Sequence, residues 1–170
     1  MRDVEYLEFM WPMRTFLVTC GDIKGKSNII AVSFCMPVSK EPPMLACAIT
    51  KTAYSSELIS ACGEFIVNVP PASLKRQIYF CGTHSGRTME KYKEAGLTLR
   101  SARSVKAPIV GECLAFMECT AVSRVPAGDK YLFIGEVMEA YADEAIVEGG
   151  RDVEFAEGEF PRKIYGTRFP

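Results

Sequence analysis

Three polar segments of the chain contain residue types that suit the binding of a flat, anionic ligand. The first is the stretch 26–34, KSNIIAVSF, in which Asn28 tolerates a turn conformation and Ala31 and Ser33 are small residues in a strand-like pattern. Small side chains allow a flat ligand to approach the backbone, whose N–H and C=O groups can then bind its edge. The alternative is an ordinary strand that follows a hairpin, and the spacing alone favours that alternative.

The second segment, 50–59 (TKTAYSSELI), places a cation and several hydroxyl groups at the expected start of a helix. Free backbone N–H groups and the positive end of the helix dipole attract anions, and a lysine adds a full positive charge. This pattern indicates a phosphate site formed by Lys51, Thr52, Ser55 and Ser56. The alternative, in which Ser55 only caps the helix, is equally compatible with the pattern.

The third segment, 81–92 (CGTHSGRTMEKY), interrupts a helical pattern with Gly82 and Gly86. Ser85 and Arg87 lie beside the interruption, and Lys91 lies one turn beyond Arg87. This arrangement is compatible with a second polar clamp on an anionic ligand. The alternative is a helix–loop–helix connection whose basic side chains face solvent, and the segment by itself favours that alternative.

Common catalytic motifs are absent from the sequence, which contains no GxSxG, no HExxH, no P-loop and no GxGxxG after a strand. His84 is the single histidine, and nothing around it frames a Ser–His–Asp triad. A protein with an apolar frame and few acid–base groups commonly takes its chemistry from a cofactor. The sequence therefore favours a cofactor-dependent function.

The seven cysteines are widely spaced, without a CxxC pair or a histidine-rich cluster. The sequence therefore does not favour a zinc or iron–sulfur site, and no metal is expected. Most of the cysteines fall in apolar stretches such as MLACAI and FMECTAV, which is typical of small core residues. Reduced cysteines predict a reducing compartment, the cytoplasm.

The elements that would position the three polar segments are short and bounded by turn residues. Strands are predicted over 14–20, 29–34, 44–49, 64–69, 131–141 and within 107–125, with a proline-bounded loop over 37–43. A short helix is predicted within 51–63, with Ser55 as its N-cap and Gly63 at its C-terminal end. A second helical stretch runs from 73 to 95, broken at CGTHSG and stopped by Gly96.

Short strands joined by hairpin turns predict a mainly β fold, an antiparallel barrel of about seven strands with two or three short helices. The stretches IIAVSF, MLACAI and YLFIGEV are apolar on both faces, whereas a small antiparallel barrel exposes one polar face. Apolar outer faces predict a partner, most simply a second copy of the chain. We expect one domain over residues 1–170, with an irregular, charged tail over 148–170.

Composition excludes several classes of protein. Hydrophobic residues make up 48% and charged residues 24%, which suits a globular core, and the longest apolar runs are too short to span a bilayer. The N-terminus lacks the pattern of a secretory signal peptide. A net charge of −1 and a pI near 5.9 give no indication of nucleic acid or an anionic membrane as a partner.

Five stretches, taken in chain order, carry a resemblance to a known family. They are FLVTC…GKSNIIAVSF, EPPMLACAIT…YSSELISACGEFIVNVP, CGTHSGRTMEKY, VKAPIVGECLAFMEC and GDKYLFIGEV, and they span roughly residues 12–142. Together they resemble the flavin reductase-like family with an FMN-binding split barrel, especially its flavoredoxin-like branch. The resemblance implies a homodimer of antiparallel split barrels, with one FMN per subunit in a groove at the dimer interface. The tail over 148–170 would pack at this interface.

The resemblance also implies three groups of cofactor contacts. The isoalloxazine ring would be lined by Asn28, Ala31, Val32, Ser33 and Phe34. The phosphate or ribityl end would be held by Lys51, Thr52, Ser55 and Ser56, and the pocket would be closed by Ser85, Gly86 and Arg87. Relatives often carry a basic residue where this chain has Ala53, so Lys51 would take over phosphate binding.

Lys130 marks a departure from the family pattern. Many flavin reductases of the family read GDH where this chain reads Gly128-Asp129-Lys130, and that His is associated with the flavin and nicotinamide side of the pocket. Lysine does not stack as imidazole does, and it brings a fixed positive charge. Lys130 is a candidate for stabilising the anionic reduced flavin near N1, or for attracting an acidic electron partner. The alternative is a solvated hairpin residue.

The resemblance implies an FMN-binding oxidoreductase similar to NAD(P)H:flavin oxidoreductases. It would pass electrons from NADH, NADPH or a redox protein through bound FMN to an acceptor. One alternative is a non-enzymatic, flavoredoxin-type electron carrier, which the lysine at position 130 favours. Another is a dimeric split-barrel binding module without redox activity.

Overall fold

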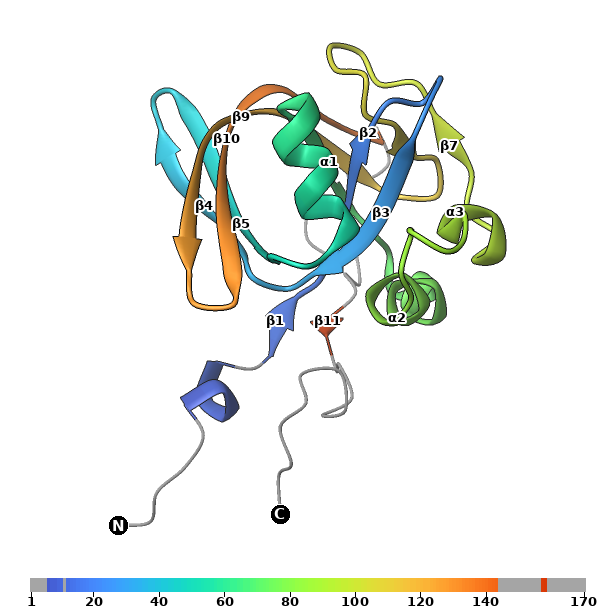
Figure 1. The fold of residues 1–170 in the computed structure, drawn as a ribbon, viewed down its shortest axis with the longest axis horizontal. Coiled ribbons are helices and arrows are strands. Elements are labelled where there is room, and N and C mark those ends of the chain that lie inside the picture. Colours follow the sequence, from blue (N-terminus) through green and yellow to red (C-terminus); the bar gives the residue numbers. More distant parts are fainter. Residues whose placement is uncertain (1–5, 11, 144–156, 159–170) are drawn as a thin grey trace.

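The main feature of the computed structural model, which describes residues 6–10, 12–143 and 157–158, is a seven-stranded antiparallel sheet (Figure 1). The strand order across the sheet is β3-β2-β6-β9-β10-β5-β4. The strands are β2 (Phe16–Gly21), β3 (Ser27–Val32), β4 (Cys35–Lys40), β5 (Pro43–Thr50), β6 (Glu64–Val69), β9 (Ala115–Ala127) and β10 (Lys130–Ala142). The predicted mainly β, antiparallel architecture is confirmed.

The sheet closes into a barrel because the strands at its two edges are consecutive in the chain. Only residues 33 and 34 separate the end of β3 from the start of β4. At this seam, the backbone N–H of Ala48 in β5 donates a hydrogen bond of 2.8 Å to the carbonyl oxygen of Phe34. Among the described residues, β3 pairs with β2 alone, so its outer edge carries no strand and the barrel is split along this side.

Two hairpin turns depend on glycine. Gly21, the last residue of β2, has a φ of 91°, and a Cβ there would lie 2.1 Å from the carbonyl oxygen of Lys26. Gly128 has a φ of 56° and is the first of the two residues that join β9 to β10. Glycine at the first central position is the requirement of a type II′ turn, whose twist matches that of the flanking strands. This second turn places Lys130 at the start of β10.

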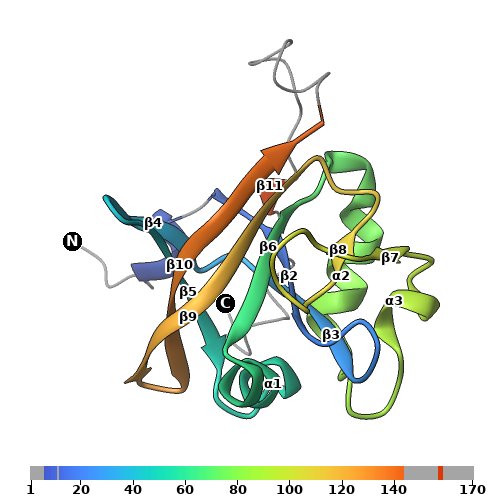
Figure 2. The ribbon, with the colours of Figure 1, turned by 90° about the horizontal axis from the view of Figure 1, so that it is seen from above.

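The helices pack around the split barrel (Figure 2). Helix α1 (Tyr54–Cys62) contacts β2 and β3 and inserts Ile59 into the barrel interior. The short 3₁₀ helix η2 (Ala72–Leu74) leads into α2 (Lys75–Thr83), and α3 (Lys91–Glu94) follows; both α2 and α3 contact β3. No helix in the described part of the chain is long and apolar enough to cross a membrane.

Two apolar clusters explain why β2, β3 and β6 are apolar on both faces. Phe65 and Val67, with Val18, face the barrel interior. Leu17, Ile29 and Ile66 face outward and are covered by α2 and the segment that follows it. The outer face of β3 is therefore covered within the chain and does not require the partner that the sequence predicts for it.

Smaller elements complete the described chain. The 3₁₀ helix η1 (Tyr6–Met10) precedes β1 (Met13–Arg14), which pairs with β11 (Glu157–Gly158), and β7 (Leu99–Arg100) pairs with β8 (Ile109–Val110). β11 is thus a short strand within the tail predicted to be irregular. The rest of the 148–170 segment lies outside the described residues, and its place at a dimer interface stays a prediction.

The prediction of a loop over 37–43 is wrong, because residues 35–40 form the edge strand β4. Proline is accepted in a sheet at an edge or a bulge, where no ladder hydrogen bond is lost. Pro37 meets both conditions. Its strand β4 lies at the edge of the sheet, and the pairing register with β5 shifts between Pro37 and Ser39, which marks a bulge.

Two details of the predicted helices also need correction. Ala53 is the N-cap of α1, whereas Ser55 lies inside the helix and is fully buried, so its hydroxyl does not cap the helix. Helix α2 continues through Gly82 to Thr83, and the interruption falls after this point, before Lys91. Gly63 has a φ of 71° and ends α1 in the left-handed conformation, as predicted.

Candidate functional site

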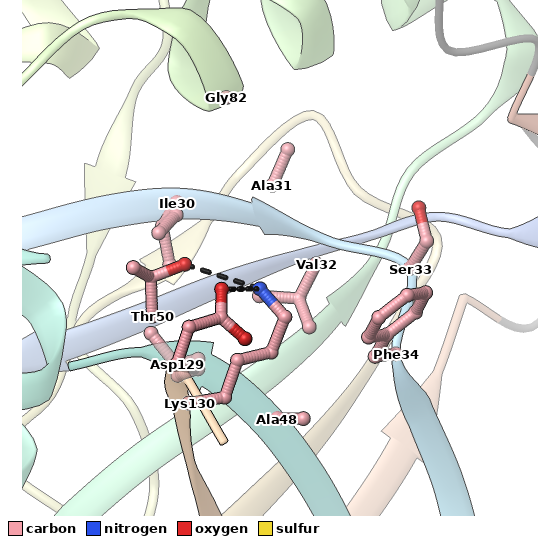
Figure 3. A pocket seen from close by; sticks show the side chains of 11 residues that line it. Ile30, Ala31, Val32, Ser33, Phe34, Ala48, Thr50, Gly82, Asp129 and Lys130 are labelled. Carbon is pink, nitrogen blue, oxygen red and sulfur yellow. Dashed lines mark hydrogen bonds and ion pairs between the residues drawn. The ribbon is translucent and has the colours of Figure 1, made fainter. Parts of the chain in front are cut away.

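A pocket opens at the seam where the barrel is split (Figure 3). It has a volume of about 230 Å³. Its walls come from the end of β3, the end of β5, the β9–β10 turn and one glycine of α2. The lining residues are Ile30, Ala31, Val32, Ser33, Phe34, Ala48, Ile49, Thr50, Gly82, Asp129 and Lys130.

The walls of this seam pocket are small on one side and aromatic on another. Ala31 and Ala48 present only methyl groups, so the unpartnered edge of β3 is open to a ligand. The Ser33 hydroxyl shares a hydrogen bond of 2.8 Å with the hydroxyl of Thr15, so the Ser33 side chain is already paired within the protein. Phe34 supplies a half-buried ring. A flat ring system with polar atoms along one edge matches these walls.

Lys130 supplies a cation at the pocket wall. Pairing between β10 and β5 places Lys130 directly opposite Thr50, and its Nζ lies 3.2 Å from the Thr50 hydroxyl. The same Nζ lies 3.5 Å from the Asp129 carboxylate and 5.6 Å from the centroid of the Phe34 ring. The Lys130 side chain is 17% exposed, against 78% for Asp129. The alternative of a solvated hairpin lysine is therefore wrong.

The start of α1 is tied to the rim of the pocket. The backbone N–H of Lys51 donates to the carbonyl oxygen of Asp129 at 3.0 Å. The Ser56 hydroxyl donates to the carbonyl oxygen of Thr50, a pocket residue, at 2.8 Å. Lys51 and Thr52 are exposed beside this rim. A ligand larger than the pocket can therefore extend from it toward Lys51 and Thr52.

Three of the predicted contact residues pack against one another instead of lining the pocket. The Asn28 side-chain amide donates to the Ser55 hydroxyl at 2.9 Å, and both side chains are buried. A Cβ on Gly86 would lie 2.0 Å from the Asn28 Oδ1, so glycine is required for this close approach. These contacts fix the 84–90 loop against β3 and α1, and a direct role for the three residues in binding stays a prediction.

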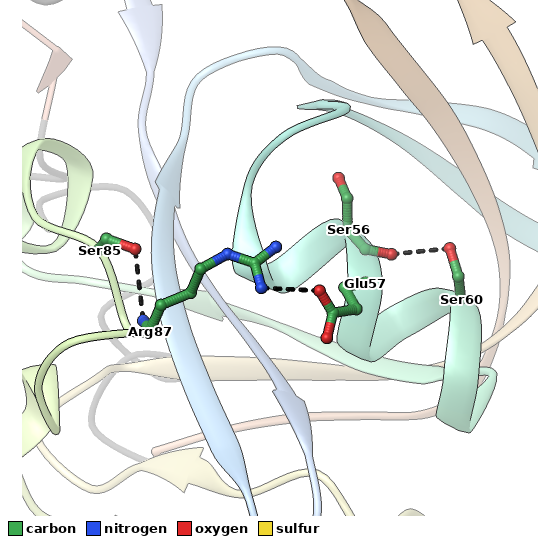
Figure 4. Close-up of polar contacts among 5 residues, drawn as sticks. All are labelled: Ser56, Glu57, Ser60, Ser85 and Arg87. Carbon is green, nitrogen blue, oxygen red and sulfur yellow. Dashed lines mark hydrogen bonds and ion pairs between the residues drawn. The ribbon is translucent and has the colours of Figure 1, made fainter.

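Arg87 joins the second and third polar segments (Figure 4). Its guanidinium forms an ion pair of 2.8 Å with Glu57 and lies 5.2 Å from the centroid of the Tyr54 ring. Its backbone N–H donates to the Ser85 hydroxyl at 3.3 Å. The two segments therefore meet at the first turn of α1, where an anionic ligand would compete with Glu57 for Arg87.

Five predicted contacts line the seam pocket: Ala31, Val32, Ser33, Phe34 and Lys130. The sequence analysis assigned no cofactor contact to the other lining residues, which are Ile30, Ala48, Ile49, Thr50, Gly82 and Asp129. The missing signal was strand register, because Thr50 reaches Lys130 only when β5 and β10 pair as they do.

The size of the pocket limits what it holds. Sites that enclose a complete drug-sized ligand commonly measure about 300–1,000 Å³. A pocket of about 230 Å³ suits a flat ring, with the remainder of a larger ligand outside it. Because one wall carries an ammonium group and another an open strand edge, the pocket favours a ring with an electron-rich, hydrogen-bonding edge.

Solved structures identify the class of this barrel. Flavoredoxin from Methanosarcina acetivorans aligns with a TM-score of 0.76 and 29% identity, over 85% of this chain and 76% of that one. The FMN-binding domain of a flavin reductases-like enzyme from Shewanella baltica aligns with a TM-score of 0.68 and 25% identity, over 77% and 70%. The fold is that of the FMN-binding split barrels.

Sequence comparison assigns the family. Residues 10–161 match the family described as Flavin reductase like domain. An uncharacterized protein of Archaeoglobus fulgidus is 36% identical over 152 residues, which are 89% of this chain and 85% of the relative. The chain belongs to the flavin reductase-like family.

Proposed function

We propose that this chain binds FMN with its ring in the seam pocket and acts as a flavin reductase-like oxidoreductase, passing electrons from NADH, NADPH or a redox protein to an acceptor. The observation that carries the proposal is the pocket itself. It combines small side chains, an open strand edge and the Lys130 ammonium group at the split of the barrel.

The residues fit this cofactor in size and charge. When bound, FMN supplies a centre that accepts and releases electron pairs. The edge of β3 would orient the ring through backbone N–H and C=O groups, and Phe34 would cover it. Lys130 would stabilise negative charge at the ring edge, because Thr50 and Asp129 hold its Nζ at the pocket wall. No side chain is required as a general acid.

The phosphate or ribityl end would leave the pocket past Thr50. Lys51 and Thr52 are exposed there, at the positive end of α1. Arg87 is the second cation at this helix end, although Glu57 holds it in the structure. We assign the phosphate to Lys51 and Thr52 because their cationic and hydroxyl groups are not engaged with a carboxylate in any described contact.

An electron carrier that does not use NAD(P)H directly is the second candidate, favoured by the charges around Tyr131. Lys51 Nζ lies 5.5 Å from the centroid of the Tyr131 ring, and the Arg124 guanidinium lies 4.7 Å from it. Lys51 and Arg124 are exposed, and Lys130 precedes Tyr131 in the strand. Basic residues grouped beside a pocket would steer an acidic redox protein toward it.

We further propose a cytoplasmic homodimer whose interface includes the outer face of β4, β5, β10 and β9. Register places Met36, Ala46 and Ile134 in one row across three of these strands, and Ala48, Leu132 and Val125 in the next. Met36 is 55% exposed and Val125 43%. Because Ala48 also lines the pocket, a second copy on this face would border the flavin site.

An anaerobic reduction assay tests the proposed function. We expect the purified protein to bind FMN, and its flavin absorbance to bleach within seconds of mixing with NADH or NADPH. Bleaching only after a reduced redox protein is added would support the carrier instead. If flavin-free protein failed to bind added FMN, a binding module without redox activity would replace both proposals.

The phosphate assignment has its own test. We expect Lys51→Ala to weaken FMN binding about tenfold or more, because a charge-assisted contact to a phosphate contributes on the order of 1.5–3 kcal/mol. Lys24→Ala, at an exposed lysine in the β2–β3 turn, is the matched control. Equal FMN affinity in the two variants would move the phosphate toward Arg87.

A further inference from the structure

Two cysteines face each other across the edge of the barrel. Cys35 is the first residue of β4, and the antiparallel register places it directly opposite Cys47 in β5. The Cys47 thiol donates to the Cys35 sulfur at a distance of 3.0 Å between the two sulfur atoms. Both are free thiols in the structure.

The pairing of β4 with β5, and the hydrogen bond next to it, show that Cys35 and Cys47 form a closely spaced pair of opposed residues. Phe34 and Ala48, one position away, are joined by a backbone hydrogen bond. Opposed pairs in an antiparallel ladder alternate between hydrogen-bonded and non-hydrogen-bonded, so Cys35 and Cys47 form a non-hydrogen-bonded pair. Such pairs have Cα atoms about 4.5 Å apart, within the range of about 4.4–6.8 Å that disulfides span. The backbone therefore already has the spacing of a cross-strand disulfide.

The surroundings give the two thiols different roles. Cys35 is half-buried and within reach of solvent, whereas Cys47 is fully buried in the barrel core. The hydrogen bond to Cys35 and burial both raise the pKa of the Cys47 thiol well above its ordinary value. An external reagent therefore meets Cys35 first, and Cys47 reacts only with a sulfur presented beside it.

We propose that Cys35 and Cys47 form a reversible dithiol–disulfide site, oxidised by low-molecular-weight disulfides. Cys35 loses its proton to solvent and its sulfur attacks the small disulfide, whose S–S bond breaks to release one thiolate. The Cys47 sulfur then attacks the Cys35 sulfur, and the Cys47 proton passes to the departing sulfur of the small disulfide. This forms the Cys35–Cys47 bond and releases the second small thiol. The protein loses two electrons and two protons, and the small disulfide becomes two thiols.

This site is separate from the seam pocket and does not rest on the proposed function. Successive residues of a strand point to opposite faces. Phe34 and Ala48 line the pocket, whereas their neighbours Cys35 and Cys47 belong to or pack against the barrel core. The disulfide would join the edge strand β4 to β5 next to the seam, without a sulfur atom entering the pocket.

Mass spectrometry tests the site on the full-length protein. Reduced protein is incubated with oxidised glutathione, free thiols are blocked with an alkylating agent under denaturing conditions, and peptides are mapped without reduction. We expect one Cys35–Cys47 linked peptide, loss of two hydrogen masses per chain, and more than about a tenfold fall in alkylation of both residues. Dithiothreitol should reverse all three changes.

Variants separate this pair from the other thiols. Cys62→Ser, at an exposed cysteine, should form the link as the wild type does, whereas Cys35→Ser should not. A stable glutathione adduct on Cys35 of the wild type would overturn the proposal, because Cys47 would have failed to resolve it. A link mapped to Cys119, the other thiol whose charge acts on Cys47, would overturn it as well.

Discussion

At the scale of single residues, Lys130 connects the turn to the chemistry of the pocket. Replacing it with methionine keeps most of its volume and removes its charge. We expect Lys130→Met to lower the midpoint potential of bound FMN by about 30 mV or more, equal to about 1.4 kcal/mol for a two-electron couple, because negative charge in the pocket loses its nearest cation. FMN affinity should change by less than about threefold. Potentiometric titration measures the first quantity and fluorescence titration the second.

The arginine variant separates charge from packing. Lys130→Arg should keep the potential near that of the wild type. If both variants shifted the potential equally, the position would act through packing alone. If neither variant shifted it, Lys130 would have no effect on the flavin.

Ser55 was predicted to cap α1 or to bind phosphate, but its hydroxyl is paired with the buried side chain of Asn28. The Ser55 hydroxyl accepts a hydrogen bond from the buried side-chain amide of Asn28, so Ser55→Ala leaves that amide without this partner. We expect the free energy of unfolding to fall by about 1–3 kcal/mol, measured by urea denaturation. Ser60→Ala, at an exposed position of the same helix, should cost less. Equal losses in the two variants would show that the Asn28–Ser55 contact contributes little.

At the scale of elements, the β9–β10 hairpin sets the position of Lys130. Nothing lies within 4 Å of a Cβ placed on Gly128, so Gly128→Ala tests backbone conformation alone. The positive φ should cost about 1–2 kcal/mol of unfolding free energy. Gly25→Ala is the matched control, because Gly25 lies in another hairpin turn, has no positive φ and has space for a methyl group. A loss in Gly25→Ala as large as that in Gly128→Ala would contradict the explanation.

Glu118 in β9 fastens the segment that follows β7 to the sheet. Its buried carboxylate accepts hydrogen bonds from the backbone of Arg103, Ser104 and Val105 and from the hydroxyls of Ser104 and Tyr141. Burial alone would raise its pKa, but these donors outweigh burial and hold the pKa below its ordinary value. The resulting stability is present above the unfolded pKa and is lost as pH falls through the folded pKa.

This contact gives a prediction for the segment. Glu118→Gln should lower the free energy of unfolding at pH 7 by about 2 kcal/mol or more, because one carboxylate oxygen becomes an NH₂ group facing donors. The loss should shrink as pH falls below the unfolded pKa towards the lowered folded pKa, because the wild-type carboxylate then begins to take up a proton. Urea denaturation at pH 7 and at pH 3 measures both values, and a loss independent of pH would contradict the role of the charge.

Elements with strong local signals were predictable from the sequence. Residues 64–69 form β6 as predicted, and Gly63 and Gly96 end their helices. The elements that depend on distant partners were not predictable. β4 exists because β5 pairs with it despite Pro37. The wall of the pocket that contains Thr50 depends on register between strands far apart in sequence, and local patterns carry no information about that register.

At the scale of the whole molecule, the buried thiols predict how stability depends on pH. Burial raises the pKa of Cys20 and Cys119 to about 12 and of Cys81 to about 11; the pKa values of Cys113 and Cys47 are also raised. Raised folded pKa values give stability that is present below the unfolded pKa and is lost as pH rises through the folded pKa. At pH 10, each buried thiol should lower the free energy of unfolding by about 1–2 kcal/mol relative to its value at pH 7.5.

Lys91 acts in the opposite direction. Burial lowers its pKa to about 8, so its charged form disfavours the folded state at neutral pH. Its contribution rises between pH 8 and the unfolded pKa, by about 2 kcal/mol at pH 10. Because five thiols oppose one lysine, we expect net destabilisation above pH 9 under reducing conditions, measured by urea denaturation. Cys119→Ala should reduce the fall and Cys62→Ser should not; a flat profile to pH 10 would contradict the account.

The split in the barrel has a consequence for how ligand binding and folding are coupled. The pocket takes its walls from the edge strand β3, from β5 and from the β9–β10 turn that contains Gly128, so it exists only once β10 has paired with β5. A ligand that binds this seam stabilises the closed barrel and has no site on an open sheet. Flavin fluorescence therefore reports whether the barrel is closed. In any variant that loosens an edge strand, the first measurable change should be a faster release of FMN.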